Sequence, residues 1–109
     1  MKISDTLTNQ KKELEFSDKV RIYLCGVTVY DQSHIGHART IIVFDTLRRF
    51  LEANRIPVEL IQNFTDVDDK IINRAKEQGE SAKGLSNKYI QTYFEDSDRL
   101  NIKRATNYP

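Results

Sequence analysis

The sequence has few of the features that mark secreted, membrane-spanning or nucleic-acid-wrapping proteins. Its single cysteine cannot form an internal disulfide, which excludes a small secreted domain held together by such bonds. No apolar run approaches the roughly 20 residues that cross a bilayer, and the N-terminus lacks a hydrophobic signal core. The 17 basic and 16 acidic residues leave a net charge of +1, which excludes a strongly basic surface that wraps nucleic acid. We therefore expect a cytoplasmic protein with no membrane contact.

The composition is that of a folded domain. The 109 residues correspond to about one domain of ordinary size. Hydrophobic residues make up 39% of the chain, enough for a core, and the 30% of charged residues include both signs, which argues against disorder. No internal repeat or low-complexity tract marks a domain boundary.

The first half of the chain predicts a strand, a helix and a second strand. Residues 20–27 are rich in β-branched and aromatic types, as are residues 58–64, and both segments are typical of strands. Between them, apolar residues from Ile35 onward recur at three- and four-residue steps and predict an amphipathic helix over 34–53, with Ser33 as its N-cap. Strands separated by such a helix are expected to be parallel with a right-handed crossover, so we predict an α/β fold with a parallel sheet.

The remaining segments are expected to be simpler. We interpret residues 1–19 as an extended entry segment that could contribute a short edge strand. A helix capped by Thr65 or Asp66 should end at Gly79, and another should begin at Ser81. Its predicted buried stripe is Leu85, Tyr89, Tyr93 and Leu100. The basic pairs are expected to be solvated surface features: Lys11-Lys12, Arg48-Arg49 and Lys103-Arg104.

The loop after residues 20–27 is the candidate site, because ligands of open α/β folds bind at the carboxyl edge of the sheet. His34 and His37, three residues apart, lie on one face at the start of the predicted helix, where phosphate is favoured. Imidazoles in that place can donate hydrogen bonds to phosphoryl oxygens. Gly36 would let a nucleotide approach the backbone. The spacing alone is a weak signal, and the alternative is two histidines that decorate a helix start.

The cysteine and the aspartates near this edge each have two possible roles. Cys25 is either a small buried hydrophobic residue or a zinc thiolate, and with the two histidines it supplies at most three of the four ligands that zinc sites need. Three aspartates, at positions 66, 68 and 69, either favour a helix N-terminus or bind Mg²⁺. Thr65 ends the second strand and can face the same crevice as Cys25.

Longer blocks of sequence resemble cysteinyl-tRNA synthetases. The likeness begins in residues 23–31 and 34–40. Within the second segment, His34-Ile35-Gly36-His37 is the HIGH signature of class I aminoacyl-tRNA synthetases. The Cys25-Gly26 pair upstream and the block at residues 63–71 narrow the resemblance to the cysteine enzyme. Residues 5–11 and 100–102 also look similar, so that the likeness covers nearly the whole chain.

The resemblance implies a Rossmann-type catalytic domain that activates cysteine with ATP and Mg²⁺ and then esterifies it to tRNA(Cys). It implies Cys25 as one ligand of a zinc ion, which binds the substrate as a thiolate and discriminates against the harder hydroxyl of serine. It implies that Gly26, Thr28 and Thr65 border the cysteine pocket. It also implies that His34, Gly36 and His37 bind ATP, the two histidines being catalytic.

The family's other zinc ligands, its KMSKS loop and its tRNA-binding helices have no counterpart in residues 1–109. We therefore expect residues 1–109 to be the N-terminal portion of the catalytic domain, inactive by itself and part of a monomer. Three alternatives stay open. One is the related ligase of mycothiol synthesis, although Val29 and Ile35 side with the tRNA enzyme. The others are a truncated, non-catalytic nucleotide-binding module and a different nucleotidyl transferase with an H-x-G-H loop.

Overall fold

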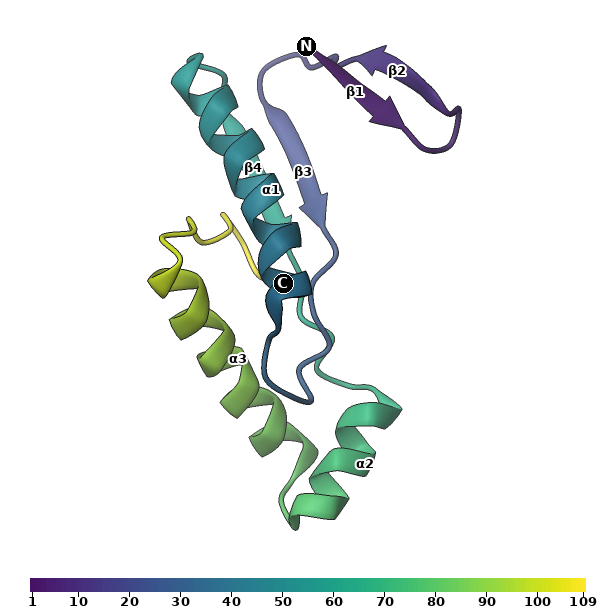
Figure 1. Ribbon diagram of the computed structural model, residues 1–109, viewed down its shortest axis with the longest axis vertical. Coiled ribbons are helices and arrows are strands. Elements are labelled where there is room, and N and C mark those ends of the chain that lie inside the picture. The colour runs from purple at the N-terminus through teal and green to yellow at the C-terminus, as the bar shows by residue number, and fades with distance from the viewer.

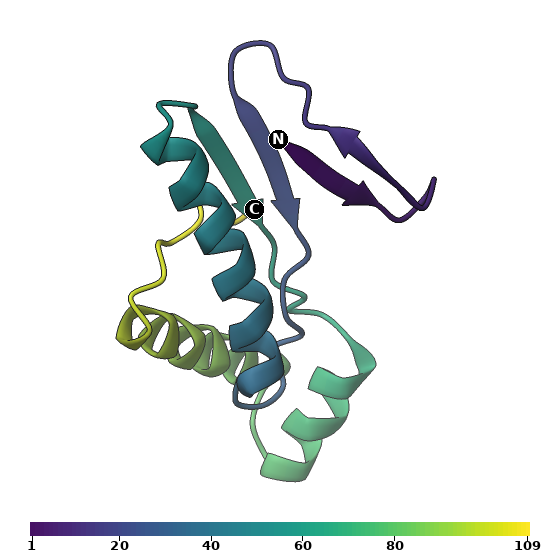
Figure 2. The same cartoon turned by 45° about the horizontal axis from the view of Figure 1, so that its top comes forward.

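The computed structural model describes residues 1–109 as a mixed α/β chain. In chain order its elements are β1 (Lys2–Asp5), β2 (Gln10–Glu13), β3 (Val20–Leu24), α1 (Ile35–Ala53), β4 (Val58–Gln62), α2 (Asp69–Gln78) and α3 (Ala82–Arg99) (Figure 1). β3 and β4 pair in parallel, from Val20 opposite Val58 to Leu24 opposite Gln62. Figure 2 shows the two strands side by side with α1 running along them. The predicted parallel strand–helix–strand unit is confirmed.

Both strands are shorter than predicted. β3 ends at Leu24 and β4 at Gln62, and pairing resumes only at a single bridge between Thr28 and Thr65. A Cβ on Gly26 would lie 1.4 Å from the carbonyl oxygen of Asn63. The two chains therefore approach too closely here for a regular ladder to continue, and the predicted strands over 20–27 and 58–64 were too long.

The helix caps differ from the predicted ones by one to three residues. His34, rather than Ser33, caps α1, because its side chain accepts a hydrogen bond from the Gly36 amide. Asp68, rather than Thr65 or Asp66, caps α2 by accepting from the Lys70 amide. The other ends are confirmed: α2 ends at the left-handed Gly79 (φ 69°), and Ser81 caps α3.

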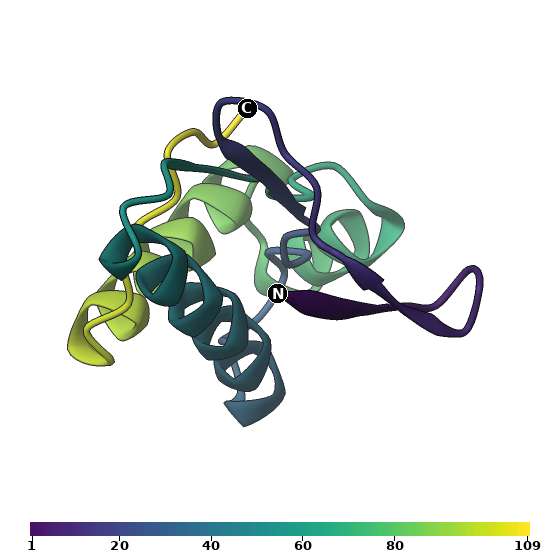
Figure 3. The same cartoon turned by 90° about the horizontal axis from the view of Figure 1, so that it is seen from above.

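The N-terminal segment forms an element of its own. β1 and β2 pair antiparallel as a hairpin and do not join the β3–β4 sheet, so the predicted edge strand was wrong. Figure 3 shows the hairpin projecting away from the helices. Leu7, near its tip, is 94% exposed.

The main apolar cluster lies under α2 and α3 and includes the loop after β3. Its buried members are Val29, Ile71, Ala75, Leu85 and Tyr89. Tyr93 is also buried, which confirms most of the predicted stripe of α3, but Leu100 follows the helix and is 50% exposed. Since Val29 is only 1% exposed, the core anchors the candidate site loop from one side.

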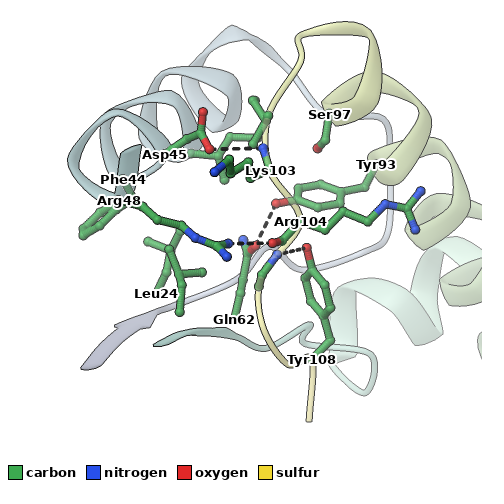
Figure 4. A pocket seen from close by; sticks show the side chains of 14 residues that line it. Leu24, Phe44, Asp45, Arg48, Gln62, Tyr93, Ser97, Lys103, Arg104 and Tyr108 are labelled. Carbon is green, nitrogen blue, oxygen red and sulfur yellow. Dashed lines mark hydrogen bonds between the residues drawn. The ribbon is translucent and has the colours of Figure 1, made fainter. Parts of the chain in front are cut away.

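The basic pairs of α1 and the C-terminal segment are not the free surface features that we predicted. Arg48 Nη1 donates to the carbonyl of Arg104 over 2.7 Å, and Arg49 Nη2 donates to that of Asn101 over 2.6 Å. Lys103 pairs with Glu52. Figure 4 shows Arg48, Lys103 and Arg104 among the side chains around a small cavity between α1, α3 and the C-terminal segment. The pairs therefore hold the returning chain against α1.

Much of the apolar surface is uncovered. Only 13 of 109 residues are buried, and the radius of gyration is 16.3 Å, against about 13 Å for a compact domain of this length. Ile35, predicted to face the core, is 87% exposed, and Val43 and Phe50 on the same helix are more than half exposed. None of the helices is both long and apolar enough to span a membrane.

Candidate functional site

The candidate site lies where β3 and β4 end and α1 begins. The Thr65 amide donates to the Val27 carbonyl over 3.1 Å, and the Val29 amide donates to the Thr65 carbonyl over 3.2 Å. These bonds hold the two loops together beyond the ends of the strands. Cys25 and Thr65 therefore lie at the same edge of the sheet, as the parallel topology predicts.

The two histidines cap α1 together. His34 Nδ1 accepts from the Gly36 amide over 3.1 Å, and His37 Nδ1 accepts from the His34 amide over 3.2 Å, which completes a capping box. Their rings stack with centroids 3.9 Å apart and planes at 23°. Gly36 makes this packing feasible, because a Cβ there would lie 2.9 Å from the His34 ring.

The capping bonds fix the tautomer of both rings. A neutral imidazole has one donor nitrogen and one acceptor nitrogen, and in both rings Nδ1 is the acceptor. Each ring therefore carries its proton on Nε2, which has no hydrogen-bond partner in the chain. Burial, and next the neighbouring His34, lower the pKa of His37, so this ring is neutral at pH 7. The helix start thus presents two stacked rings, each with an Nε2–H donor.

Two adjoining cavities open at this edge. The first, of about 290 Å³, is lined by His34, His37, Thr28, Tyr30, Asp31, Gln32 and Lys70. The second, of about 330 Å³, is lined by Cys25, Gly26, Val27, Thr28, His37, Thr40, Ile41, Leu24 and Gln62. Thr28 and His37 line both, so the cavities meet between these two side chains. The first is lined almost entirely by polar side chains, and the second has the Cys25 thiol in its wall.

Five of the seven predicted site residues line these cavities: Cys25, Gly26, Thr28, His34 and His37. The other two do not. Gly36 lines a shallower hollow on the outer side of α1, and Thr65 joins the site only through its backbone bonds.

The cavity-lining residues that were missed in the sequence include Lys70, Gln62 and Gln32. Lys70 carries positive charge into the histidine cavity, and its ammonium lies 5.7 Å from the centre of the Tyr30 ring. Gln62 is buried, accepts from the Tyr93 hydroxyl over 3.0 Å and lines the thiol cavity. A polar residue at an inward strand position was the available signal for Gln62. Gln32 has no such signal.

The residues of this chain do not by themselves form a zinc site. Cys25 is exposed, which excludes its interpretation as a buried hydrophobic residue. Within residues 1–109 no three or more His, Cys, Asp or Glu side chains converge as metal ligands would. Both histidines use Nδ1 for capping. Asp68 caps α2 and Asp69 lies in its first turn, which confirms the helix-terminus interpretation for these two carboxylates.

Comparisons with known proteins agree with this arrangement. Residues 11–109 match the family described as the class I (C) tRNA synthetase catalytic domain. The chain is 52% identical to a cysteine–tRNA ligase of Gloeothece citriformis over 98% of its length, and 53% identical to one of Caldicellulosiruptor saccharolyticus over its whole length. It covers 22% and 24% of those two proteins, and so spans about a quarter or less of the relatives it matches.

A solved structure shows the same fold. Methionyl-tRNA synthetase of Mycobacterium tuberculosis, in complex with methionyl-adenylate, aligns with a TM-score of 0.74 over 83% of this chain and 18% of that one. At 20% identity this likeness shows the fold alone. The parallel β3–α1–β4 unit, the histidine-capped helix at its edge and the family match over residues 11–109 together show that this chain belongs to the class I (C) tRNA synthetase catalytic domain family.

Proposed function

We propose that this chain supplies the ATP-binding and cysteine-binding edge of a cysteine–tRNA ligase, which activates cysteine with ATP and transfers it to tRNA(Cys). The observation that carries the proposal is the pair of stacked histidines that caps α1 beside the Cys25 cavity. The identity of about 50% to cysteine–tRNA ligases supports this reaction over that of the mycothiol ligase and over other nucleotidyl transferases.

In this proposal the histidine cavity binds the phosphates of ATP, with Mg²⁺ as their counterion. His34 and His37 donate from Nε2 to phosphoryl oxygens, and the start of α1 adds its positive dipole end. Negative charge builds up there when the carboxylate of cysteine attacks the α-phosphate and pyrophosphate leaves. Donors already oriented by the capping box stabilise that charge without rearranging.

The thiol cavity is the proposed cysteine pocket, with Gly26, Thr28 and Thr65 at its border. We propose Cys25 as one ligand of a zinc ion whose other ligands lie outside residues 1–109, since no metal-binding cluster exists within them. A zinc ion bound there would hold the substrate as a thiolate and disfavour serine, whose hydroxyl is a harder ligand.

We also propose that residues 1–109 are the N-terminal portion of a larger catalytic domain, inactive without the rest. The small buried core, the exposed apolar residues of α1 and the coverage of 22% of the relatives support this division. The full-length protein would act as a monomer in the cytoplasm.

The test is cysteine-dependent exchange of pyrophosphate into ATP by the full-length protein. We expect exchange with cysteine and at least about 100-fold less with serine, because a thiol-selective site rejects the isosteric hydroxyl. Charging of tRNA(Cys) should follow. A folded full-length protein that shows no cysteine-dependent exchange would contradict the proposal and favour a non-catalytic nucleotide-binding module.

A further inference from the structure

The ladder between β3 and β4 contains an irregularity at Cys25. Regular pairing ends with Leu24 opposite Gln62 and resumes with Thr28 opposite Thr65. The chain after β3 thus takes four steps where the chain after β4 takes three, so that it carries one extra residue. Such a bulge bends its strand and re-aims the side chains on it, often beside an active site. Cys25 is the first residue of this bulge.

One side chain compensates for the bulge. The amide of Gly26 has no ladder partner and instead donates to Asn63 Oδ1 over 2.9 Å. That N–H belongs to the planar peptide unit that joins Cys25 to Gly26. The bond therefore fixes the backbone plane from which the Cys25 side chain projects.

Nothing else holds Cys25 as directly. Its exposed thiol makes only a weak 3.8 Å contact, in which it donates to the Gly26 carbonyl. The backbone bonds that follow hold Val27 and Val29, further along the loop. The absence of a side chain at Gly26 lets the Asn63 backbone come close, since a Cβ would lie 1.4 Å from the Asn63 carbonyl oxygen. Gly26 and Asn63 thus act together to hold the backbone beside Cys25.

We propose that Asn63 is a positioning residue: its carboxamide oxygen anchors the Cys25–Gly26 peptide and so sets where the Cys25 thiol stands in the amino-acid pocket. The inference rests on the proposed function for the role of the Cys25 thiol. To that role it adds Asn63 as the residue that orients the thiol. Partners that orient a substrate-binding or metal-binding group commonly contribute about 10- to 100-fold to affinity or activity.

The first experiment needs no ligand. Deuterium uptake of the peptic peptides that contain Gly26 is followed by mass spectrometry in the full-length protein. Asn63→Ala removes the acceptor and should speed exchange at Gly26 by about tenfold, as expected for one lost hydrogen bond. Asn63→Asp keeps an oxygen at the same position and should restore the wild-type rate. Asn73→Ala, on the exposed face of α2, is the matched control.

The second experiment separates positioning from a merely structural role. In pyrophosphate exchange, Asn63→Ala should raise KM for cysteine by about 10- to 100-fold while KM for ATP stays within about threefold. Asn63→Asp should recover most of the loss. If Asn63→Ala fails to fold, Asn63→Ser carries the same prediction, because its hydroxyl is one bond too short to reach Gly26.

The outcomes of the two experiments are distinguishable. Unchanged deuterium uptake in Asn63→Ala, or equal rises of KM for cysteine and ATP, would overturn the role of Asn63. A wild-type protein without cysteine-dependent exchange would overturn the proposed function, and the deuterium experiment would still decide whether Asn63 anchors Cys25.

Discussion

The N-termini of α1 and α2 lie near the same edge of the sheet but are capped by opposite chemistry. α2 is capped by the Asp68 carboxylate and has Asp69 in its first turn, so its positive dipole end is neutralised within the chain. α1 is capped by two imidazoles and has no acidic residue in its first turn. Its dipole end therefore has no acidic cap, and the nearby Asp31 carboxylate pairs with Arg74 instead.

In the proposed function, this difference separates a structural helix start from one that binds phosphate. Carboxylate caps stabilise α2 and repel anions. Imidazole caps accept from two backbone amides at the start of α1 and leave an Nε2–H donor on each ring. The helix start that we propose to bind phosphate is thus the one without a carboxylate cap.

The largest expected effect comes from removing the imidazole donors. His34→Ala or His37→Ala in the full-length protein should slow cysteine-dependent pyrophosphate exchange by about 10²–10³-fold, as the loss of one transition-state donor typically does. The circular-dichroism spectrum should remain that of the wild type. Exchange within twofold of wild type in both variants would remove the histidines from the mechanism.

The next effect concerns the zinc ion that we propose near Cys25. Cys25→Ser in the full-length protein should lower zinc content and weaken cysteine affinity by at least about tenfold, because it removes a soft ligand while keeping the shape. The 109-residue chain alone should bind Zn²⁺ weakly or not at all. Atomic spectroscopy measures the zinc content of the full-length protein and of the short chain. A stoichiometric, tightly held zinc in the short chain would show that all the zinc ligands lie within residues 1–109.

A smaller effect is expected at the other helix. Asp68→Ala should lower the free energy of unfolding by about 1 kcal/mol, since it removes an N-cap. Pyrophosphate exchange should stay within about twofold of the wild type. Chemical denaturation gives the first quantity, and a loss of exchange as large as that of the histidine variants would erase the distinction between the two helix starts.

The smallest effect is a pH dependence of stability. Because the folded-state pKa of His37 is lowered, the unfolded chain binds a proton first as the pH falls, so this residue costs stability below about pH 6.5. His37→Gln keeps a capping-box residue that does not titrate. Its free energy of unfolding should fall less between pH 7.5 and pH 5.5 than that of the wild type. Equal losses would contradict the shift.

The parallel unit could be predicted from the sequence because its signals are local. Segments rich in β-branched and aromatic residues identified β3 and β4, and a helical apolar pattern identified α1. Parallel pairing then placed Cys25 and Thr65 at one edge. The capping details were not predictable, because His34 is an unusual N-cap and Ser33 beside it is a common one.

Contacts between segments that are distant in the sequence could not be predicted either. The bond from the Gly26 amide to Asn63 joins residues 37 positions apart, and the contacts of Arg48 and Arg49 span more than 50. Val29 looked like a loop residue but is core, because α2 and α3 fold over it. Short-range patterns carry no information on such contacts.

One substitution tests the central claim, that α1 keeps its N-terminus for a substrate phosphate. His34→Asp installs at α1 the kind of cap that α2 has, and Asp is a good N-cap. The melting temperature should therefore not fall, whereas pyrophosphate exchange should fall at least about 100-fold, because a carboxylate replaces a donor. The reciprocal Asp68→His is the control and should leave exchange within about threefold. A stable His34→Asp protein that exchanges within twofold of the wild type would contradict the account.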